Sequence, residues 1–401
     1  MALEAAHAEV RAGVAEIIFA LPDKVPLAGY SRRHGKPSTG IHDPVGVRAL
    51  VLQDGDTVAA LVSCDLLIID ERLFEAVRRR LHDAGFSGPM TLLLAATHTH
   101  SGPGAYGTKF FEKLSMGHFD PRVFNVLVET IAETIARASR DVAPVRVASA
   151  AAATDGLIQN RVEVDGPVDR DVTVVGLYRP DGRDPMAVVV SFAAHPTTLG
   201  AWNTRLSADY PGVLRQAIEQ RWPQATAFFV AGAVGDQAPV KSGEGFERAE
   251  RIGRPLADRA IAALSGAAPG DAGHLLAAQT RMPLPPAHVR LGRFTVPRWL
   301  GARFVDDDAT LTVLAVGRAA FFGAPCDLAA GLGEALKASA RARGLEPVIV
   351  GFANDYIGYC VPERLYDQKA YESSLAFNGP KTGKLVVEGL QRLLDDILSD
   401  K

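Results

Sequence analysis

Two histidines separated by one threonine stand at the end of an apolar stretch, in the segment LLLAATHTHSGPG (92–104). Residues 91–97 read as a short buried strand, because they are mostly apolar and are bounded by Pro89 and a Gly/Pro-rich turn. Side chains alternate along a strand, so His98 and His100 would share a face if the extended backbone continued. Two imidazoles at the carboxyl end of a strand favour a metal or acid/base site, whereas a lone histidine would more often only cap the strand.

Further polar side chains follow apolar strand-like runs, where α/β proteins tend to place their sites. His195 ends VVVSFAAH, Asp236 ends FFVAGAVGD and Asp327 follows AAFFGAPC, while Tyr356 and Tyr359 follow PVIVGFAND. Each also has a structural interpretation, as a core histidine, a turn residue, a helix N-cap or a buried tyrosine. Two or three histidines with one carboxylate form a common catalytic zinc set, but spacing alone does not single out these residues.

Composition and charge exclude several classes of protein. The 401 residues are 47% hydrophobic and 22% charged with a net charge of −3, so we expect neither a nucleic-acid partner nor insertion into a membrane. The three cysteines form no CxxC pair, and Glu4 and Glu9 stand where a secretory leader would be basic and then apolar. We therefore predict a cytoplasmic protein with reduced cysteines.

Strand-like apolar runs alternate with amphipathic stretches along the whole chain, and no internal repeat is evident. This mixture predicts the α/β class, with a mixed β-sheet core flanked by helices. The segment 48–67 predicts a hairpin that turns at Asp54-Gly55. Segments 104–119 and 283–308 are irregular and carry aromatic residues, so they are candidate lids over a pocket, or loops that simply pack down. The expected helices are 71–85, 122–139, 210–222, 245–265, 328–343 and 383–399, and the other expected strands are 172–179, 186–195, 226–236, 310–323 and 347–353.

Five segments together resemble the neutral/alkaline ceramidase family. They are ATHTHSGPGAYG (96–107), FAAHPTTLG (192–200), GDQAP (235–239), APCDL (324–328) and NDYIGYCVPERLYDQKAYESSLAFNGP (354–380). They follow the family's order and cover nearly the whole chain, and the first and last are the most specific. The resemblance implies a single ceramidase-like catalytic domain over residues 1–401, without the family's C-terminal immunoglobulin-like domain.

The resemblance also implies a zinc site and its surroundings. Asp327 stands where the family has a glutamate ligand and is one methylene shorter. His100 and Arg161 would face the substrate and stabilise an oxyanion. The implied zinc ligands are His98, His195, Asp327 and Tyr359, and the implied orienting or substrate-contacting residues are Asp65, Asp209, Gln237, Asn354 and Tyr356.

One departure from the family changes the expected chemistry. The family's nucleophilic serine is replaced by Ala238, whose methyl group cannot attack a carbonyl. We therefore predict a zinc-dependent hydrolase that cleaves an amide or ester bond in a small, partly apolar molecule, with zinc-bound water as nucleophile. Asp236, or a group that the sequence does not identify, would serve as general base. The alternatives are a zinc Lewis-acid cyclase, lyase or acyl-transfer enzyme and an inactive ligand-binding homologue. A homo-oligomer is compatible with the sequence.

Overall fold

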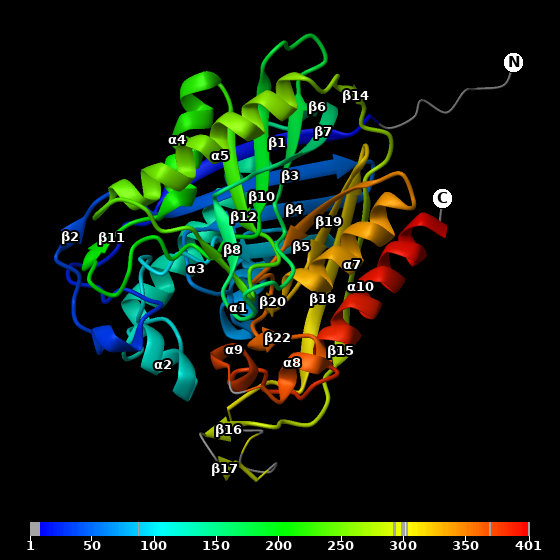
Figure 1. Ribbon diagram of the computed structural model, residues 1–401. Coiled ribbons are helices and arrows are strands. Elements are labelled where there is room, and N and C mark those ends of the chain that lie inside the picture. Colours follow the sequence, from blue (N-terminus) through cyan, green and yellow to red (C-terminus); the bar gives the residue numbers. More distant parts are fainter. Residues whose placement is uncertain are drawn as a thin grey trace, which may run out of the picture.

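Three mixed β-sheets form the centre of the molecule, and helices lie on their outer faces (Figure 1). Side chains of all three sheets join one inner apolar core, which includes Leu50, Val175 and Phe321. The predicted α/β class with mixed sheets and flanking helices is confirmed, although the described strands are divided among these three sheets and four two-stranded ones. The computed structural model describes residues 9–86, 88–291, 294–297, 301, 304–368 and 370–399.

The first sheet has the strand order β5-β4-β3-β1 with β6 at its edge. The predicted hairpin is confirmed, because β3 and β4 pair around Asp54 and Thr57, and Gly55 has a φ of 55°. Asp70 caps the following helix by accepting the Leu73 N–H at 2.8 Å. The elements are β1 (Arg11–Ile18), β3 (Gly46–Asp54), β4 (Thr57–Cys64), α1 (Glu71–Asp83), β5 (Met90–Ala96), α3 (Pro121–Ala138) and β6 (Ala143–Pro144).

The second sheet repeats this arrangement in the order β12-β10-β9-β7, with β14 at its edge. Its central strand β10 is buried over its full length, as its continuous apolar run requires. Helices α4 and α5 pack against each other and against this sheet. The elements are β7 (Arg146–Ala153), β9 (Asp171–Tyr178), β10 (Pro185–Phe192), α4 (Tyr210–Arg221), β12 (Thr226–Ala231), α5 (Glu247–Ser265) and β14 (Gly270–Asp271).

The third sheet has the order β21-β19-β18-β15. The segment 310–323, expected as one strand, is a hairpin of β18 and β19 that turns at Gly317, which has a φ of 57°. Helices α7 and α10 pack together on the outer side of this sheet. The elements are β15 (Leu276–Pro283), β18 (Asp308–Val316), β19 (Ala319–Gly323), α7 (Ala330–Arg341), β21 (Glu346–Val350) and α10 (Thr382–Ser399).

The three sheets share one plan, which no sequence repeat reveals. In each, three antiparallel strands are followed by a helix, a strand parallel to the third, and a second helix. The carboxyl ends of the parallel strands lead into the loops that carry the candidate site. The short elements are η1 (Ser31–Arg33), β2 (Gly40–Ile41), α2 (Phe110–Met116), β8 (Ile158–Asn160), β11 (Arg205–Leu206), β13 (Gln237–Pro239), β16 (Arg290–Leu291), β17 (Phe294–Thr295), β20 (Asp327–Leu328), β22 (Tyr359–Cys360), α8 (Glu363–Tyr366) and α9 (Tyr371–Ser374).

Two features concern the chain as a whole. Cys64, Cys326 and Cys360 are buried and free. Within the described parts of the chain, no helix combines the length and the apolar character needed to cross a bilayer.

Candidate metal centre

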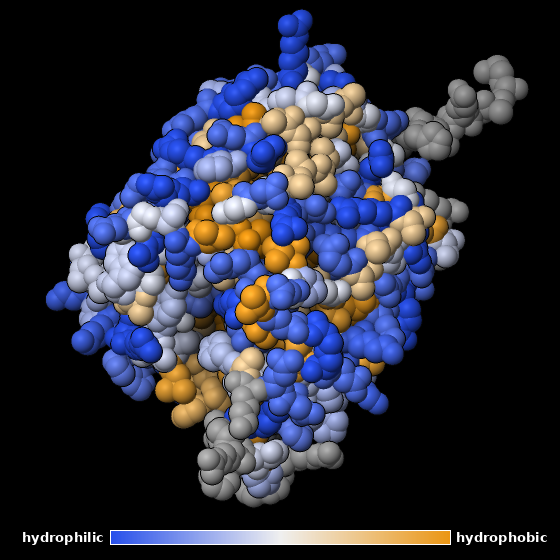
Figure 2. Space-filling view, viewed as in Figure 1, coloured by the Kyte–Doolittle hydropathy of each residue, from blue (hydrophilic) through white to orange (hydrophobic). Residues whose placement is uncertain are grey.

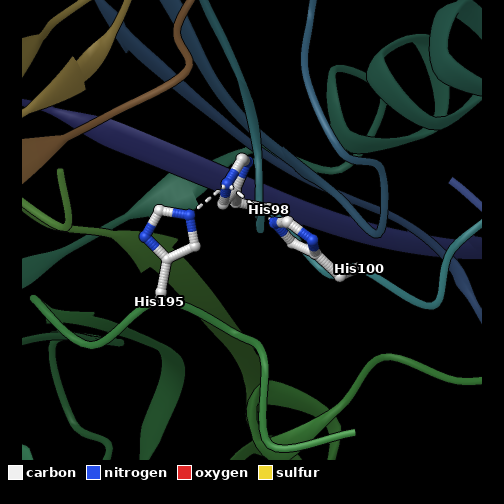
Figure 3. Close-up of side chains that lie close together, drawn as sticks. All are labelled: His98, His100 and His195. Atoms are coloured by element: carbon white, nitrogen blue, oxygen red, sulfur yellow. Dashed lines mark hydrogen bonds between the residues drawn. The ribbon is translucent and has the colours of Figure 1, made fainter. Parts of the chain in front are cut away.

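Three imidazoles meet where the loops after β5 and β10 come together (Figure 3). The Nε2 atom of His98 lies 2.8 Å from Nε2 of His195 and 3.2 Å from Nε2 of His100. His98 and His195 are buried, and His100 is half-buried. Two nitrogens bound to one tetrahedral zinc ion at about 2.0–2.1 Å lie roughly 3.3 Å apart. The spacing of the imidazoles is therefore close to that of a ligand set.

The backbone fixes the second ring nitrogen of two of these histidines. Nδ1 of His98 lies 2.6 Å from the Leu67 carbonyl oxygen, and Nδ1 of His195 lies 3.0 Å from that of Val234. A carbonyl only accepts, so each Nδ1 carries the proton and each Nε2 presents a lone pair. Burial lowers the pKa of His98 to about 3 and holds the pKa of His195 well below its usual value. Facing lone pairs repel each other unless a cation lies between them, so this arrangement fits a bound metal.

Asp327 supplies a carboxylate oxygen to the same point. Its Oδ1 lies 3.5 Å from Nε2 of His195 and 3.7 Å from Nε2 of His98, and it has no hydrogen-bond partner among the described residues. Its Oδ2 accepts the Tyr356 hydroxyl at 2.8 Å. Burial raises the pKa of this carboxyl to about 7. A buried carboxylate oxygen without a hydrogen-bond partner is available to coordinate a cation. Sites that mix imidazole and carboxylate donors are typical of zinc.

The alternative that Asp327 caps a helix is wrong. Asp327 belongs to β20, and α7 begins three residues later at Ala330. The Ala330 N–H donates to Oδ1 of Asp236 at 2.8 Å, so a residue from another loop holds the start of this helix. The Asp327 carboxylate is therefore left for the site.

Tyr359 is placed beside Asp327 by the pairing of β20 with β22, in which these two residues are partners. The Tyr359 hydroxyl accepts a hydrogen bond from Nη2 of Arg161 at 2.9 Å. Burial and the nearby Asp327 raise the pKa of Tyr359 well above its usual value, and Arg161 opposes this shift. Tyr359 lines the same cavity as His98 and His195, so the structure brings the four predicted ligands into one neighbourhood.

The predicted geometry of the His-Thr-His segment is wrong, although the two imidazoles do converge. Strand β5 ends at Ala96, and His98 has a φ of 62°, so the backbone turns instead of continuing as a strand. Left-handed backbone is costly for a residue with a side chain and is retained where the surroundings over-determine it. The His98 ring stacks on Phe352 with centroids 3.7 Å apart, and Phe352 itself has a φ of 55°. Stacking and the bond to Leu67 hold the imidazole in place.

Two buried aspartates hold the loops that carry the histidines. Asp65 forms a bidentate ion pair with Arg215 at 2.7 and 2.9 Å, and it also accepts the Thr97 hydroxyl at 3.4 Å. Asp209 accepts the Thr198 hydroxyl and the Leu199 N–H, close after His195 in the chain. Both positions agree with the orienting role that the resemblance implies.

Asn354 fastens the strand that precedes His98. Its Oδ1 accepts the Leu94 N–H and its Nδ2 donates to the Thr312 hydroxyl, both at 2.8 Å. Its own backbone is left-handed, with a φ of 66°. Asn354 therefore ties β5 of the first sheet to β18 of the third and contacts no residue of the ligand set directly.

Asp236 and Gln237 lie outside the set of described residues that line the cavity. Besides Ala330, the Asp236 carboxylate accepts from the Gln237 side chain at 2.8 Å and from Asn160 at 3.2 Å, and its carbonyl accepts the Arg161 N–H at 2.8 Å. The general-base role of Asp236 stays a prediction, while its contacts hold Arg161 and α7 in place.

A cavity of about 560 Å³ opens beside the three imidazoles. Both segments predicted as lids contribute to its lining, through Phe111 of the first and Phe304 of the second. Residues 292–293, 298–300 and 302–303 of the second segment lie outside the described residues. Ala238, at the family's serine position, is not among the described lining residues.

The wall of the cavity is rich in apolar side chains. Phe111 of α2 stacks on Phe377 with centroids 5.0 Å apart, and Leu375 packs in the same cluster. Figure 2 shows apolar surface at the lower left, over α2, and the exposed apolar side chains of this helix are Phe110 and Leu114. The site is therefore suited to a ligand with an apolar part.

Sequence reasoning missed several residues of the site. Glu372 forms an ion pair with Arg161 at 2.8 Å, Tyr30 and Lys241 line the cavity, and Phe352 stacks on His98. Glu372 stands inside the family-like segment 354–380, which was a usable signal. The other three have no local pattern that distinguishes them from ordinary surface or core residues.

A second group of acidic residues surrounds a lysine of α7. Oxygen atoms of Asp169, Asp171 and Glu334 lie within 4.8 Å of one another. The Lys337 ammonium reaches all three, at 2.5 Å from Asp169, 3.6 Å from Asp171 and 3.4 Å from Glu334. A buried side-chain cation therefore already lies among these carboxylates.

Comparison with known proteins identifies the family. The neutral/alkaline non-lysosomal ceramidase N-terminal family matches residues 13–274, and the chain belongs to this family. It is 28% identical over 298 residues to a neutral ceramidase of Mycobacterium tuberculosis, covering 65% of this chain and 46% of that protein. It is 28% identical over 259 residues to a neutral ceramidase of Pseudomonas aeruginosa, covering 57% and 38%. The chain thus spans less than half the length of these relatives.

Solved structures agree on the fold. The crystal structure of neutral ceramidase from Pseudomonas aeruginosa matches with a TM-score of 0.84 at 22% identity, covering 96% of this chain and 74% of that one. A structure described as a ceramidase complexed with C2 matches with a TM-score of 0.83 at 20% identity, covering 97% and 76%. At these identities the likeness establishes the fold.

Proposed function

We propose that this protein is a zinc-dependent hydrolase that cleaves an amide or ester bond in a partly apolar molecule. The observation that carries the proposal is the convergence of three Nε2 atoms and the unpartnered Oδ1 of Asp327 beside an aromatic-lined cavity. Nitrogen and oxygen donors in this combination favour zinc over magnesium or calcium, which take oxygen ligands. His98, His195 and Asp327 would hold the ion, with Tyr359 as the fourth ligand.

Zinc in such a site polarises a carbonyl and lowers the pKa of water to about 7. The protein residues bind and orient the substrate around it. Arg161 is fixed by Glu372 and Tyr359, so its guanidinium is a preorganised positive charge for the oxygen of the scissile carbonyl. His100 lines the cavity beside His98 and His195 and would donate to the same oxygen. Solvent supplies the nucleophile, because Ala238 cannot.

The choice of an amide or ester follows from the family. The curated relatives carry the name neutral ceramidase, and a ceramide is an N-acylated lipid. The apolar cluster around Phe111 and Phe377 supports an acyl or alkyl chain in the cavity. Hydrolysis would break the C–N bond, add the oxygen of water to the acyl carbon and leave the nitrogen protonated as a free amine.

Metal content and turnover test this proposal together. We expect the purified protein to hold about one zinc per chain, to lose it on His98→Ala, and to retain it on His82→Ala, whose side chain is 75% exposed on α1. Turnover of a panel of N-acyl amides and esters should follow the zinc content. A protein that takes up no zinc, or that turns substrates over equally after chelation and in the His98→Ala variant, would contradict the proposal.

Two substitutions of Asp327 test whether its carboxylate is a zinc ligand. Asp327→Ala should lose zinc, and Asp327→Glu, which restores the residue expected in the family, should retain it. If Asp327→Ala binds zinc as tightly as the wild type, this carboxylate is not a ligand.

A further inference from the structure

The cavity is more positively charged than an uncharged substrate requires. Four of its described lining residues are lysine or arginine, and Glu112 is the only carboxylate among them. Oε2 of Glu112 already accepts two backbone N–H groups at 2.7 Å, at the start of α2. Two of the cations are also satisfied within the protein, because Lys109 pairs with Asp306 and Arg161 pairs with Glu372.

The remaining two cations, Arg32 and Lys241, have no ion-pair partner among the residues that the structure describes. Both are exposed. Arg32 belongs to η1, directly after Tyr30, and Lys241 follows β13. Both side chains line the cavity that contains the three imidazoles.

The same cavity also has an apolar wall, which is formed by the cluster of Phe111, Phe304 and Phe377. The site therefore offers three kinds of contact: an apolar wall, a group of imidazoles and a pair of free cations. A ligand that used all three would have an apolar chain, a reactive carbonyl and an anionic group. A ceramide has the first two only, and it has no anionic group that could form an ion pair with an ammonium or guanidinium.

We propose that the substrate is an anionic amphiphile, an N-acylated amino acid or a close analogue, whose carboxylate is bound by Arg32 and Lys241. The proposal rests on the hydrolase function proposed above and narrows its substrate class. Arg32 and Lys241 are specificity-determining residues, since they contact the substrate away from the bond that breaks. Hydrolysis of such an amide gives a carboxylate of the acyl chain and a free amino acid, with one water consumed.

Binding of a matched pair of probes that cannot be hydrolysed tests the charge preference separately from catalysis. The probes are (octyloxy)acetate and 2-(octyloxy)ethanol, which share the chain, differ in charge and contain no amide or ester bond, and the measurement is titration calorimetry on the zinc-loaded protein. Two exposed ion pairs should favour the acetate about tenfold in Kd. Arg32→Gln and Lys241→Gln should each reduce this preference about threefold, and the double variant should abolish it. Arg179→Gln, at an exposed turn residue outside the set of described lining residues, is the control and should keep it.

The outcomes separate the two proposals. Equal binding of the two probes by the wild type, or no binding of either, overturns the anionic substrate. A preference that survives in the double variant and disappears in His98→Ala also overturns it, because the carboxylate is then bound by the metal. A preference that depends on Arg32 and Lys241 in a protein that hydrolyses no amide or ester supports the anionic ligand and refutes the hydrolase.

Discussion

Adding a single methyl group at Gly29 should displace His100 and leave the other residues of the metal centre in place. Its φ is 104°, and an added Cβ would lie 2.6 Å from the Cβ, Cγ and Nδ1 atoms of His100. Contacts this short are not tolerated, so Gly29→Ala must displace the His100 ring. His98 and His195 do not depend on Gly29, because their Nδ1 atoms are held by backbone carbonyls of Leu67 and Val234.

The magnitude has two parts. A backbone conformation restricted to glycine costs about 1–3 kcal/mol once a Cβ is present, which lowers the free energy of unfolding. The displaced imidazole adds a second effect, since misplacing a catalytic group by about 1 Å reduces turnover about a hundredfold. Zinc content should stay near that of the wild type, because His100 is not one of the four proposed ligands.

Gly85→Ala is a matched control for the backbone cost alone, without the displacement of His100. Gly85 has a φ of 95° and no atom within 4 Å of an added Cβ. Both variants should lose stability in urea denaturation, Gly29→Ala more because of its contacts with His100, and only Gly29→Ala should lose turnover. If Gly29→Ala retains wild-type turnover, or if Gly85→Ala loses as much of it, the assignment of His100 to the reaction is refuted.

Three further predictions concern the surroundings of the site. Arg215→Ala leaves the Asp65 carboxylate buried without its ion pair and should cost about 3–5 kcal/mol of unfolding free energy, whereas replacing both residues by apolar ones should cost less. Burial raises the pKa of Asp355 to about 8. The folded state therefore binds this proton more tightly than the unfolded state does, and the free energy of unfolding should decrease as the pH rises from about 4 to about 8. Asp355→Asn should flatten this dependence in denaturation measured at several pH values, and an unchanged slope would contradict it. Asp236→Ala should reduce turnover at least about tenfold as a general base or through Arg161, and unchanged turnover would remove it from the mechanism.

The elements with strong local patterns were predictable. Strands such as β10 and β12 are continuous apolar runs because both of their faces are covered, and the 48–67 hairpin has the turn residues that it needs. Strand β7, with the sequence RVASAAAA, was not predicted. Alanine has little preference for strands, and β7 forms because it pairs with β9.

The chemistry of the site could be predicted only in part. Residue types and family-like motifs pointed to residues that the structure brings together, but two geometric arguments failed. The turn at His98 depends on Phe352, and the start of α7 is held by Asp236 instead of Asp327. Both contacts join residues that are far apart in the chain, and no local periodicity reports such contacts.

The common plan of the three sheets has a consequence for folding. His98 and His100 come from the first sheet, His195 from the second and Asp327 from the third, so the ligand set exists only when all three have assembled. An ion bound there stabilises the complete native state and none of the partly folded ones. Unfolding of any one third of the chain should release zinc, and zinc release, followed with a chromogenic chelator, would then report the first cooperative opening of the molecule.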